Sequence, residues 1–321
     1  MSSPTLDGFR DAFLQYGPPV VVFNKSHSGS RMLAQLLDGA GIAMGAHLNE
    51  SWDSLDVLEL VEYLVTRYYP DYSPLWRVDQ PADRELQRLI GRVFERHLEG
   101  IAAGRRWGWK LCETVYILPV LDYCFPGAQF VHLIRDGRDV AFCDHKAPDS
   151  PLWRKIYFNT DRIRTQGGLR LSGPAYRRRS HLYNAIHWTN SVATGRAYGA
   201  MLRERYLEVR YEHLCRDLVG AATPVLEALG IADPAAAIDR LQPAVFTSSV
   251  GKFRRFPARW LKRVTAIEKP LLLELGYLAA DTEPVAGWPW HSPWADAIID
   301  RLRPRRPMPI RPAVRRDEAG A

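Results

Sequence analysis

The clearest hydrophobic pattern in the chain is an apolar run that passes through a short polar loop into a helical repeat. Residues 19–23, PVVVF, have the length and β-branched content of a buried strand, and the apolar residues 32, 33, 36 and 37 share one helical face. Six polar or small residues separate the two patterns: Ser26, His27, Ser28, Gly29, Ser30 and Arg31. A helix that begins directly after such a loop presents unpaired backbone N–H groups, so this segment predicts a phosphate or sulfate site.

Similar patterns further along the chain predict alternating strands and helices. Strands are expected at 107–111 (WGWKL), 129–134 (QFVHLI) and 206–210, with a shorter candidate at 41–45 (GIAMG). Helices are expected over 55–64, with Ser51 or Asp53 as the N-cap, over 83–103, and in a segment that ends near 229–230. This alternation predicts the α/β class, with a central parallel sheet flanked by helices. The loops after residues 23, 111, 134 and 209 should then converge at one edge of the sheet.

The chain shows no internal repeat and no interior linker, which predicts a single domain over residues 1–300. Within it, residues 144–203 interleave Trp and Tyr with many Arg. This composition suits a lid that binds an acceptor molecule, and it also suits a pair of surface helices. Residues 301–321 are rich in Pro and Arg with little to bury, and they are expected to form a basic, solvated extension.

The charge balance favours an anionic ligand, because 43 Lys and Arg residues face 36 Asp and Glu residues, a net charge of +7. No stretch approaches the roughly 20 apolar residues that a membrane span needs, and the start lacks the pattern of a secretory signal. The four cysteines have no metal-ligand or paired spacing, so we expect reduced thiols, a cytoplasmic protein and no metal.

Two common nucleotide-binding motifs are missing from the first loop. No Lys follows Gly29, so the G-x-x-x-x-G-K phosphate loop is absent, and the chain has no G-x-G-x-x-G fingerprint there. A second loop, HLIRDGRDVAFC (132–143), places Arg135 at the end of a predicted strand. Arginine suits bidentate contact with phosphate, whereas Arg138 could share that role or pair with an acid inside the fold.

The order of four segments resembles the sulfotransferases that use 3′-phosphoadenosine 5′-phosphosulfate (PAPS). These segments are the K-S-x-S-G-S loop, F-P-x-A-x-F-V-H-L-I-R-D-x-R-D-V, V-R-Y-E-x-L and G-K-F-R, and the resemblance runs from about residue 20 to residue 277. It implies a P-loop-NTPase-like sulfotransferase architecture with PAPS as co-substrate. The donor-binding residues it implies are Lys25, Ser26, His27, Ser28, Gly29, Ser30, Arg31, Arg135, Cys143, Tyr211, Gly251, Lys252 and Arg254.

Two positions depart from the family pattern. His27 stands where Lys or Arg is usual, so Lys25 or Arg31 is expected to neutralise the phosphosulfate instead. Cys143 stands where the family commonly has a Ser that bonds the 3′-phosphate, and a thiol is a weak donor. That contact is therefore either lost or supplied by a neighbour.

Sulfuryl transfer requires a base on the acceptor and cations at the developing negative charge. Lys110 resembles a family lysine near the reaction centre. The resemblance points first to Glu50 and second to Glu113 as the base, and the histidines His27 and His47 are further candidates. Glu50 could instead favour the start of a helix as an acidic residue.

The sequence thus predicts a transferase that moves a sulfuryl group from PAPS to a hydroxyl or amine of a small-molecule or carbohydrate acceptor. The alternatives are a kinase-like phosphoryl transferase and a non-catalytic nucleic-acid or anion-binding module. The missing Lys after Gly29 disfavours the first alternative, and no specific nucleic-acid motif supports the second. The sequence identifies neither the acceptor nor the oligomeric state.

Overall fold

The protein is built around a four-stranded sheet, in which all strands are parallel. The computed structural model describes residues 13–68, 84–143, 173–241 and 249–279. The strands are β1 (Val20–Asn24), β2 (Gly108–Lys110), β3 (Gln129–Ile134) and β4 (Tyr206–Arg210), in the spatial order β2-β1-β3-β4. Because the chain crosses from β2 over β1 to β3, the order of strands reverses next to β1, which is where ligands bind in such sheets.

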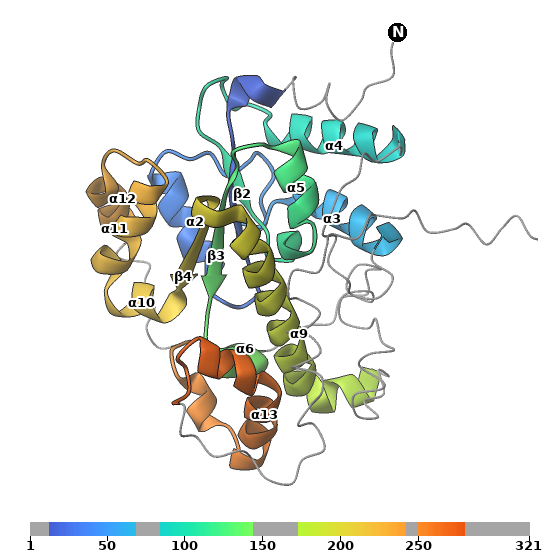
Figure 1. Ribbon diagram of the computed structural model, residues 1–321, viewed down its shortest axis with the longest axis vertical. Helices are drawn as coiled ribbons and strands as arrows, with labels where there is room; N and C mark the ends of the chain where they lie inside the picture. Colours follow the sequence, from blue (N-terminus) through green and yellow to red (C-terminus); the bar gives the residue numbers. More distant parts are fainter. Residues whose placement is uncertain (1–12, 69–83, 144–172, 242–248, 280–321) are drawn as a thin grey trace, which may run out of the picture.

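Helices cover both faces of this sheet and extend beyond its carboxyl edge (Figure 1). The α-helices of the described residues are α2 (Ser30–Gly39), α3 (Leu55–Tyr68), α4 (Arg84–His97), α5 (Leu118–Cys124), α6 (Gly137–Ala141), α9 (Gly173–Leu202), α10 (Tyr211–Arg216), α11 (Leu218–Ala228), α12 (Pro234–Leu241) and α13 (Ala258–Glu274). Short 3-10 turns are η1 (Leu14–Tyr16), η2 (Cys112–Tyr116), η3 (Arg203–Arg205) and η6 (Lys252–Arg255).

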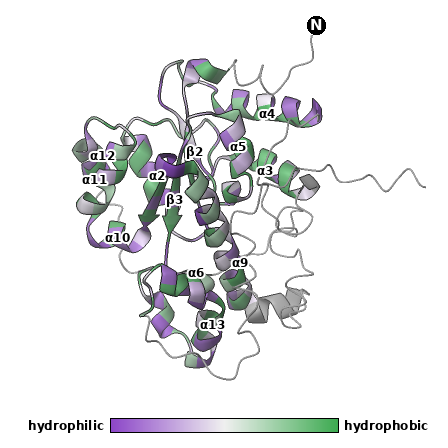
Figure 2. Cartoon of the chain, in the orientation of Figure 1, coloured by the Kyte–Doolittle hydropathy of each residue, from purple (hydrophilic) through white to green (hydrophobic). Residues whose placement is uncertain are grey.

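The side chains of β1 alternate between two hydrophobic cores, one on each face of the sheet. Val21 and Phe23 pack with residues of α3, α4 and α5, whereas Val20 and Val22 pack with residues of α2, α11 and α12. All five residues of β1 are buried, as expected for a central strand of a parallel sheet. The hydrophobic colour along β3 in Figure 2 reflects the same two-sided burial.

A third group of helices lies below the carboxyl edge of the sheet in Figure 1, where α9 runs from the sheet to α6 and α13. Trp188 of α9 is fully buried, and its indole N–H donates to the backbone oxygen of Arg135 at 3.0 Å. Residues 144–172 lie outside the described residues. The α9 part of the aromatic segment therefore packs into the fold, and the acceptor-binding role predicted for 144–203 stays a prediction.

The predicted elements at 19–23, 129–134 and 206–210 are confirmed as β1, β3 and β4. The strand predicted at 41–45 is wrong, because only Ala43 forms an isolated bridge, to Trp107. The N-cap predicted at Ser51 or Asp53 is also wrong: Ser54 Oγ accepts the amide N–H of Val57, at the start of α3. None of the described helices combines the length and hydrophobicity that a bilayer crossing requires.

Glu268 of α13 is a buried carboxyl group at the junction of α6 and α9. It has no exposed surface, and neither carboxyl oxygen has a hydrogen-bond partner among the described residues. Burial, followed by the charge of Asp136, raises the pKa of Glu268 well above its ordinary value. The folded protein therefore retains a proton that the unfolded chain releases above the ordinary Glu pKa, so this group lowers stability as pH rises.

We expect Glu268→Gln to gain stability relative to the unsubstituted protein as the pH rises above the ordinary Glu pKa, because an amide has no proton to lose. Urea unfolding at several pH values measures the difference in unfolding free energy. Glu95→Gln, at an exposed position in α4, serves as a control for the loss of a carboxylate. A difference for Glu268→Gln that does not change with pH would contradict the assignment.

Candidate active site

The first loop turns tightly between β1 and α2. The amide N–H and the hydroxyl of Ser28 both donate to the backbone oxygen of Lys25, at 3.2 and 2.6 Å. His27 and Gly29 both have positive φ, 69° and 89°, and α2 starts immediately after Gly29. The first amide N–H groups of α2 consequently have no acceptor within the helix, as the sequence predicted for an anion site.

Gly29 lies directly against the ring of Tyr211, the first residue of α10. A Cβ atom at Gly29 would lie 2.3 Å from Tyr211 Cε2, which is closer than any carbon contact allows. The absence of a side chain at Gly29 therefore lets the first loop meet the end of β4. This contact joins two of the four segments that the sequence singled out.

Arg135 connects these segments to the other two. Its Nη1 donates to the backbone oxygen of His27 at 3.1 Å, its Nη2 donates to the backbone oxygen of Ser249, and its guanidinium stacks on the Tyr211 ring at 4.7 Å. Arg135 is only 4% exposed, and its Nε has no hydrogen-bond partner among the described residues. One N–H group of this cation is thus available for an anion.

The loop before α13 is held by Asp139 of α6, which is fully buried. Its Oδ2 accepts the amide N–H of Gly251 at 2.7 Å and lies 3.5 Å from Arg135 Nη2, and its Oδ1 accepts the amide of Phe253 at 2.9 Å. Lys252 Nζ then lies 2.9 Å from Cys143 Sγ. The ammonium group of Lys252 therefore sits beside the thiol that replaces the usual hydroxyl.

Lys25 lies at the base of the first loop and is 3% exposed. Its Nζ donates to Ser26 Oγ at 2.9 Å. Burial lowers the pKa of Lys25 to about 8, although the nearby Cys112, Glu113 and Cys143 raise it. Of the cations considered for the first loop, Lys25 is buried beside the end of β2, whereas His27 and Arg31 are exposed.

Glu113 follows β2 in the η2 turn and is 6% exposed. Burial raises the pKa of Glu113 to about 7, and the charge of Asp53 adds to this effect, while Lys25 and Lys110 oppose it. A carboxyl group with this pKa exchanges its proton near neutral pH, as a general base must. The electrostatic contact with Lys25 places Glu113 at the same edge of the sheet as the first loop.

Lys110, at the end of β2, is engaged by the turn that precedes α3. Its Nζ lies 2.7 Å from Asp53 Oδ1 and donates to the backbone oxygen of Ser51 at 2.7 Å. Glu50 is an exposed residue of this same turn. The predicted catalytic residue Lys110 is thus buried against the turn that contains Glu50, and Glu50 itself lies at the surface.

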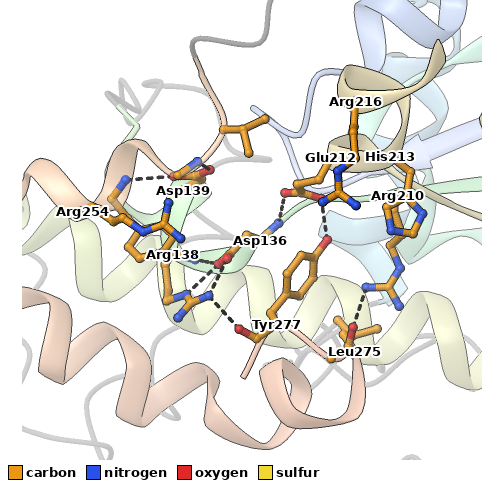
Figure 3. A pocket seen from close by; sticks show the side chains of 14 residues that line it. Asp136, Arg138, Asp139, Arg210, Glu212, His213, Arg216, Arg254, Leu275 and Tyr277 are labelled. Carbon is orange, nitrogen blue, oxygen red and sulfur yellow. Dashed lines mark hydrogen bonds and ion pairs between the residues drawn. The ribbon is translucent and has the colours of Figure 1, made fainter. Parts of the chain in front are cut away.

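Two other predicted residues have their contacts elsewhere. His47 pairs with Asp56 through Nδ1 and Oδ2 at 3.0 Å, beside the start of α3. Arg254 lines a separate cavity, together with Arg138, which binds both carboxylate oxygens of Asp136 at 2.9 and 2.6 Å (Figure 3). The structural role considered for Arg138 is therefore the one observed.

Sequence reasoning missed a buried polar group of Tyr116, His187 and Ser191. The Tyr116 hydroxyl lies 3.0 Å from Ser191 Oγ and 3.4 Å from His187 Nδ1. Burial, followed by the charge of Lys25, keeps the pKa of His187 well below its ordinary value, so this group adjoins the first loop. The polar residues 184, 187 and 191 recur at helical spacing along α9, which is the signal that could have found them.

Residues 19–235 match the sequence profile described as "Sulfotransferase family". Because this match covers well over half of the chain, the protein belongs to the sulfotransferase family. The four-stranded parallel sheet with helices on both faces confirms the fold class that the sequence predicted. No curated protein matches the chain in sequence.

Three solved structures illustrate the overall likeness. The sulfotransferase domain of the Synechococcus PCC 7002 olefin synthase is 16% identical, with a TM-score of 0.45, and the alignment covers 80% of this chain and 95% of that one. Sulfotransferase STF1 from Mycobacterium tuberculosis is 13% identical, with a TM-score of 0.46 and coverages of 82% and 81%. Sulfotransferase STF9 from Mycobacterium avium is 14% identical, with a TM-score of 0.44 and coverages of 84% and 82%.

We expect Gly29→Ala to disrupt the packing of the first loop against α10, because the new methyl group would collide with Tyr211. Gly41→Ala is a matched control: Gly41 has a φ of 90°, yet a Cβ there meets nothing within 4 Å. Both variants carry the left-handed strain of about 1–2 kcal/mol, and only Gly29→Ala carries the collision. Thermal unfolding should therefore show a larger loss for Gly29→Ala, and equal losses would contradict the close packing.

Proposed function

We propose that this protein transfers a sulfuryl group from PAPS to a hydroxyl or amine of a small-molecule or carbohydrate acceptor. The observation that carries the proposal is the meeting of the first loop, Arg135, Tyr211 and the 249–253 loop at one edge of the sheet. Membership of the sulfotransferase family supports sulfuryl transfer over the kinase-like and nucleic-acid-binding alternatives. Within the described part of the chain Cys112, Cys124, Cys143 and Cys215 form no disulfide, which suits the reducing cytoplasm that the sequence predicted.

The residues that meet at this edge of the sheet fit an adenosine bisphosphate nucleotide. The left-handed turn at Gly29 and the start of α2 suit the 5′-phosphosulfate, and the unpartnered Nε of Arg135 suits a 3′-phosphate. Lys252 takes over, in our proposal, the contact that Cys143 makes poorly. The Tyr211 ring would lie beside the adenine. When bound, PAPS supplies the sulfuryl group and leaves as 3′,5′-adenosine bisphosphate.

We assign the base to Glu113 and the stabilising cation to Lys25. Glu113 takes the proton from the acceptor, and its pKa of about 7 lets it do so near neutral pH. Lys25 holds positive charge under the loop, where negative charge develops as the bond to the leaving phosphate breaks. Lys110 positions the 49–53 turn through Asp53, and Glu50 remains the alternative base.

Binding of 3′,5′-adenosine bisphosphate tests the donor site. At 100 times its dissociation constant it should stabilise the fold by about 2.7 kcal/mol, and ATP, GTP or short DNA should do much less. Arg135→Ala should weaken this bisphosphate by roughly tenfold or more, and weaken adenosine 5′-phosphosulfate, which lacks the 3′-phosphate, less. Calorimetric titration of both ligands measures the difference, with Arg88→Ala, an exposed change in α4, as the control.

No stabilisation by the bisphosphate at millimolar concentration would overturn the proposed function. Equal losses of the two ligands in Arg135→Ala would mean that Arg135 only supports the fold. A larger loss of the bisphosphate is the result that a direct 3′-phosphate contact requires.

The assigned base and cation predict a bell-shaped pH dependence of kcat/KM. Activity should rise as Glu113 loses its proton through about pH 7 and fall as Lys25 loses its proton through about pH 8. Glu113→Gln should lower the rate by about 10²–10⁴. Lys25→Arg should remove the alkaline limb, because arginine keeps its charge at any working pH.

Release of bisphosphate from PAPS, with whichever hydroxyl or amine acceptor of a mixed panel supports turnover, measures these rates. Glu50→Gln is the matched comparison, since it removes the other candidate carboxylate and should keep both limbs. A Glu50→Gln variant without activity beside an active Glu113→Gln variant would move the base to Glu50.

A further inference from the structure

A separate cavity of about 380 Å³ lies between α6, α10, η6 and the residues that follow α13 (Figure 3). The residues of the first loop do not line it, and neither do Arg135, Cys143, Lys252 or Tyr211. Its volume lies within the range of small-molecule sites. This cavity is therefore distinct from the proposed donor site, although Val250, Gly251 and Phe253 belong to both the 249–253 loop and the cavity wall.

The carboxylates that line this cavity are all engaged within the fold. Arg138 binds both oxygens of Asp136, and Asp139 accepts two loop amides. Glu212 accepts the amide N–H of Asp136 at 2.8 Å and the hydroxyl of Tyr277 at 2.7 Å. Burial is the main reason why the pKa of Glu212 is raised. The carboxylate oxygens of these three residues are therefore already bound within the fold.

Three basic side chains remain around the same space. His213 and Arg216 lie three residues apart on α10, at one end of the cavity, and Arg254 lies at the other end (Figure 3). All three are exposed, and within the described part of the chain none has an ion pair or a side-chain hydrogen bond. Guanidinium groups bind phosphate oxygens through parallel N–H donors, so this end of α10 suits a phosphate.

Apolar side chains form part of the remaining wall, beside Arg210, whose guanidinium lies 5.3 Å from the centre of the Tyr277 ring. Phe253, Leu275 and the ring of Tyr277 contribute to it, and the hydroxyl of Tyr277 is already bound to Glu212. A ligand that fills this space needs an anionic head and a compact apolar or aromatic body. We propose that the cavity binds a phosphomonoester of this kind, with the phosphate at Arg216 and His213 and the ring against Tyr277.

Calorimetric titration of the full chain with phenyl phosphate tests the site, with phenol as the uncharged match. The titration is made with and without saturating 3′,5′-adenosine bisphosphate, which fills the proposed donor site. We expect phenyl phosphate to bind in both conditions and phenol to bind at least tenfold more weakly. Arg216→Gln should weaken phenyl phosphate by roughly tenfold or more, the usual effect of losing a charged hydrogen bond. Arg88→Gln, an exposed change in α4, should leave binding unchanged.

Three results would overturn the proposal: no binding up to millimolar phenyl phosphate, complete competition by the bisphosphate, or equal affinity in Arg216→Gln. Complete competition by the bisphosphate would place phenyl phosphate in the proposed donor site instead. If Arg216 only complements the dipole of α10, Arg216→Gln should lower the unfolding temperature without changing affinity. The titration without bisphosphate remains valid even if the chain does not bind the sulfuryl donor.

Discussion

The buried guanidinium of Arg135 is the connection on which the proposed active site depends. It reaches the first loop through the backbone oxygen of His27, the last loop through Ser249, and α10 by stacking on Tyr211. Asp139 balances its charge from 3.5 Å away and holds the amides of the last loop at the same time. Segments more than 100 residues apart in the chain therefore share one cation. An anion that accepts the Nε–H of Arg135 would contact the centre of this arrangement.

Burial moves the pKa values of Lys25 and Glu113 toward neutral pH. Lys25 and Glu113 both lose hydration, so the pKa of the lysine falls to about 8 while the pKa of the glutamate rises to about 7. Each group then exchanges its proton near neutral pH, although an ordinary lysine or glutamate does not. The Nζ of Lys110 lies 2.7 Å from Asp53 Oδ1. Two lysines at neighbouring strand ends thus have different surroundings, since Lys25 is buried at the base of the first loop and Lys110 holds a turn.

Local patterns in the sequence were sufficient to predict the sheet and the segments that meet at its edge. The continuous apolar run of β1 and the Arg135 segment after β3 each depend on neighbours in the sequence, so a short window predicts them. The strand predicted at 41–45 was wrong because a short apolar segment has no signal for its pairing partner, and only Ala43 pairs.

Side-chain direction and distant partners could not be predicted in the same way. The sequence places Lys25, His27 and Arg31 within one loop, but only the fold buries Lys25 and leaves the other two exposed. Asp139 contacts Gly251 and Phe253, which follow it by 112 and 114 positions in the chain. No local pattern predicts such a pairing. The separation of Lys252 from Arg254 likewise depends on how the loop closes over Cys143. Which side chains are buried and which distant residues they contact depends on tertiary packing, and local sequence patterns do not predict it.

The most direct measurement is a crystal structure of the full chain with 3′,5′-adenosine bisphosphate. We expect the 5′-phosphate at the amides that follow Gly29, the 3′-phosphate at Arg135 and Lys252, and the adenine beside Tyr211. The position left for the sulfuryl group should face Lys25 and Glu113. A bisphosphate bound elsewhere, or one bound here with Arg135 still donating only to backbone oxygens, would contradict the proposed donor site.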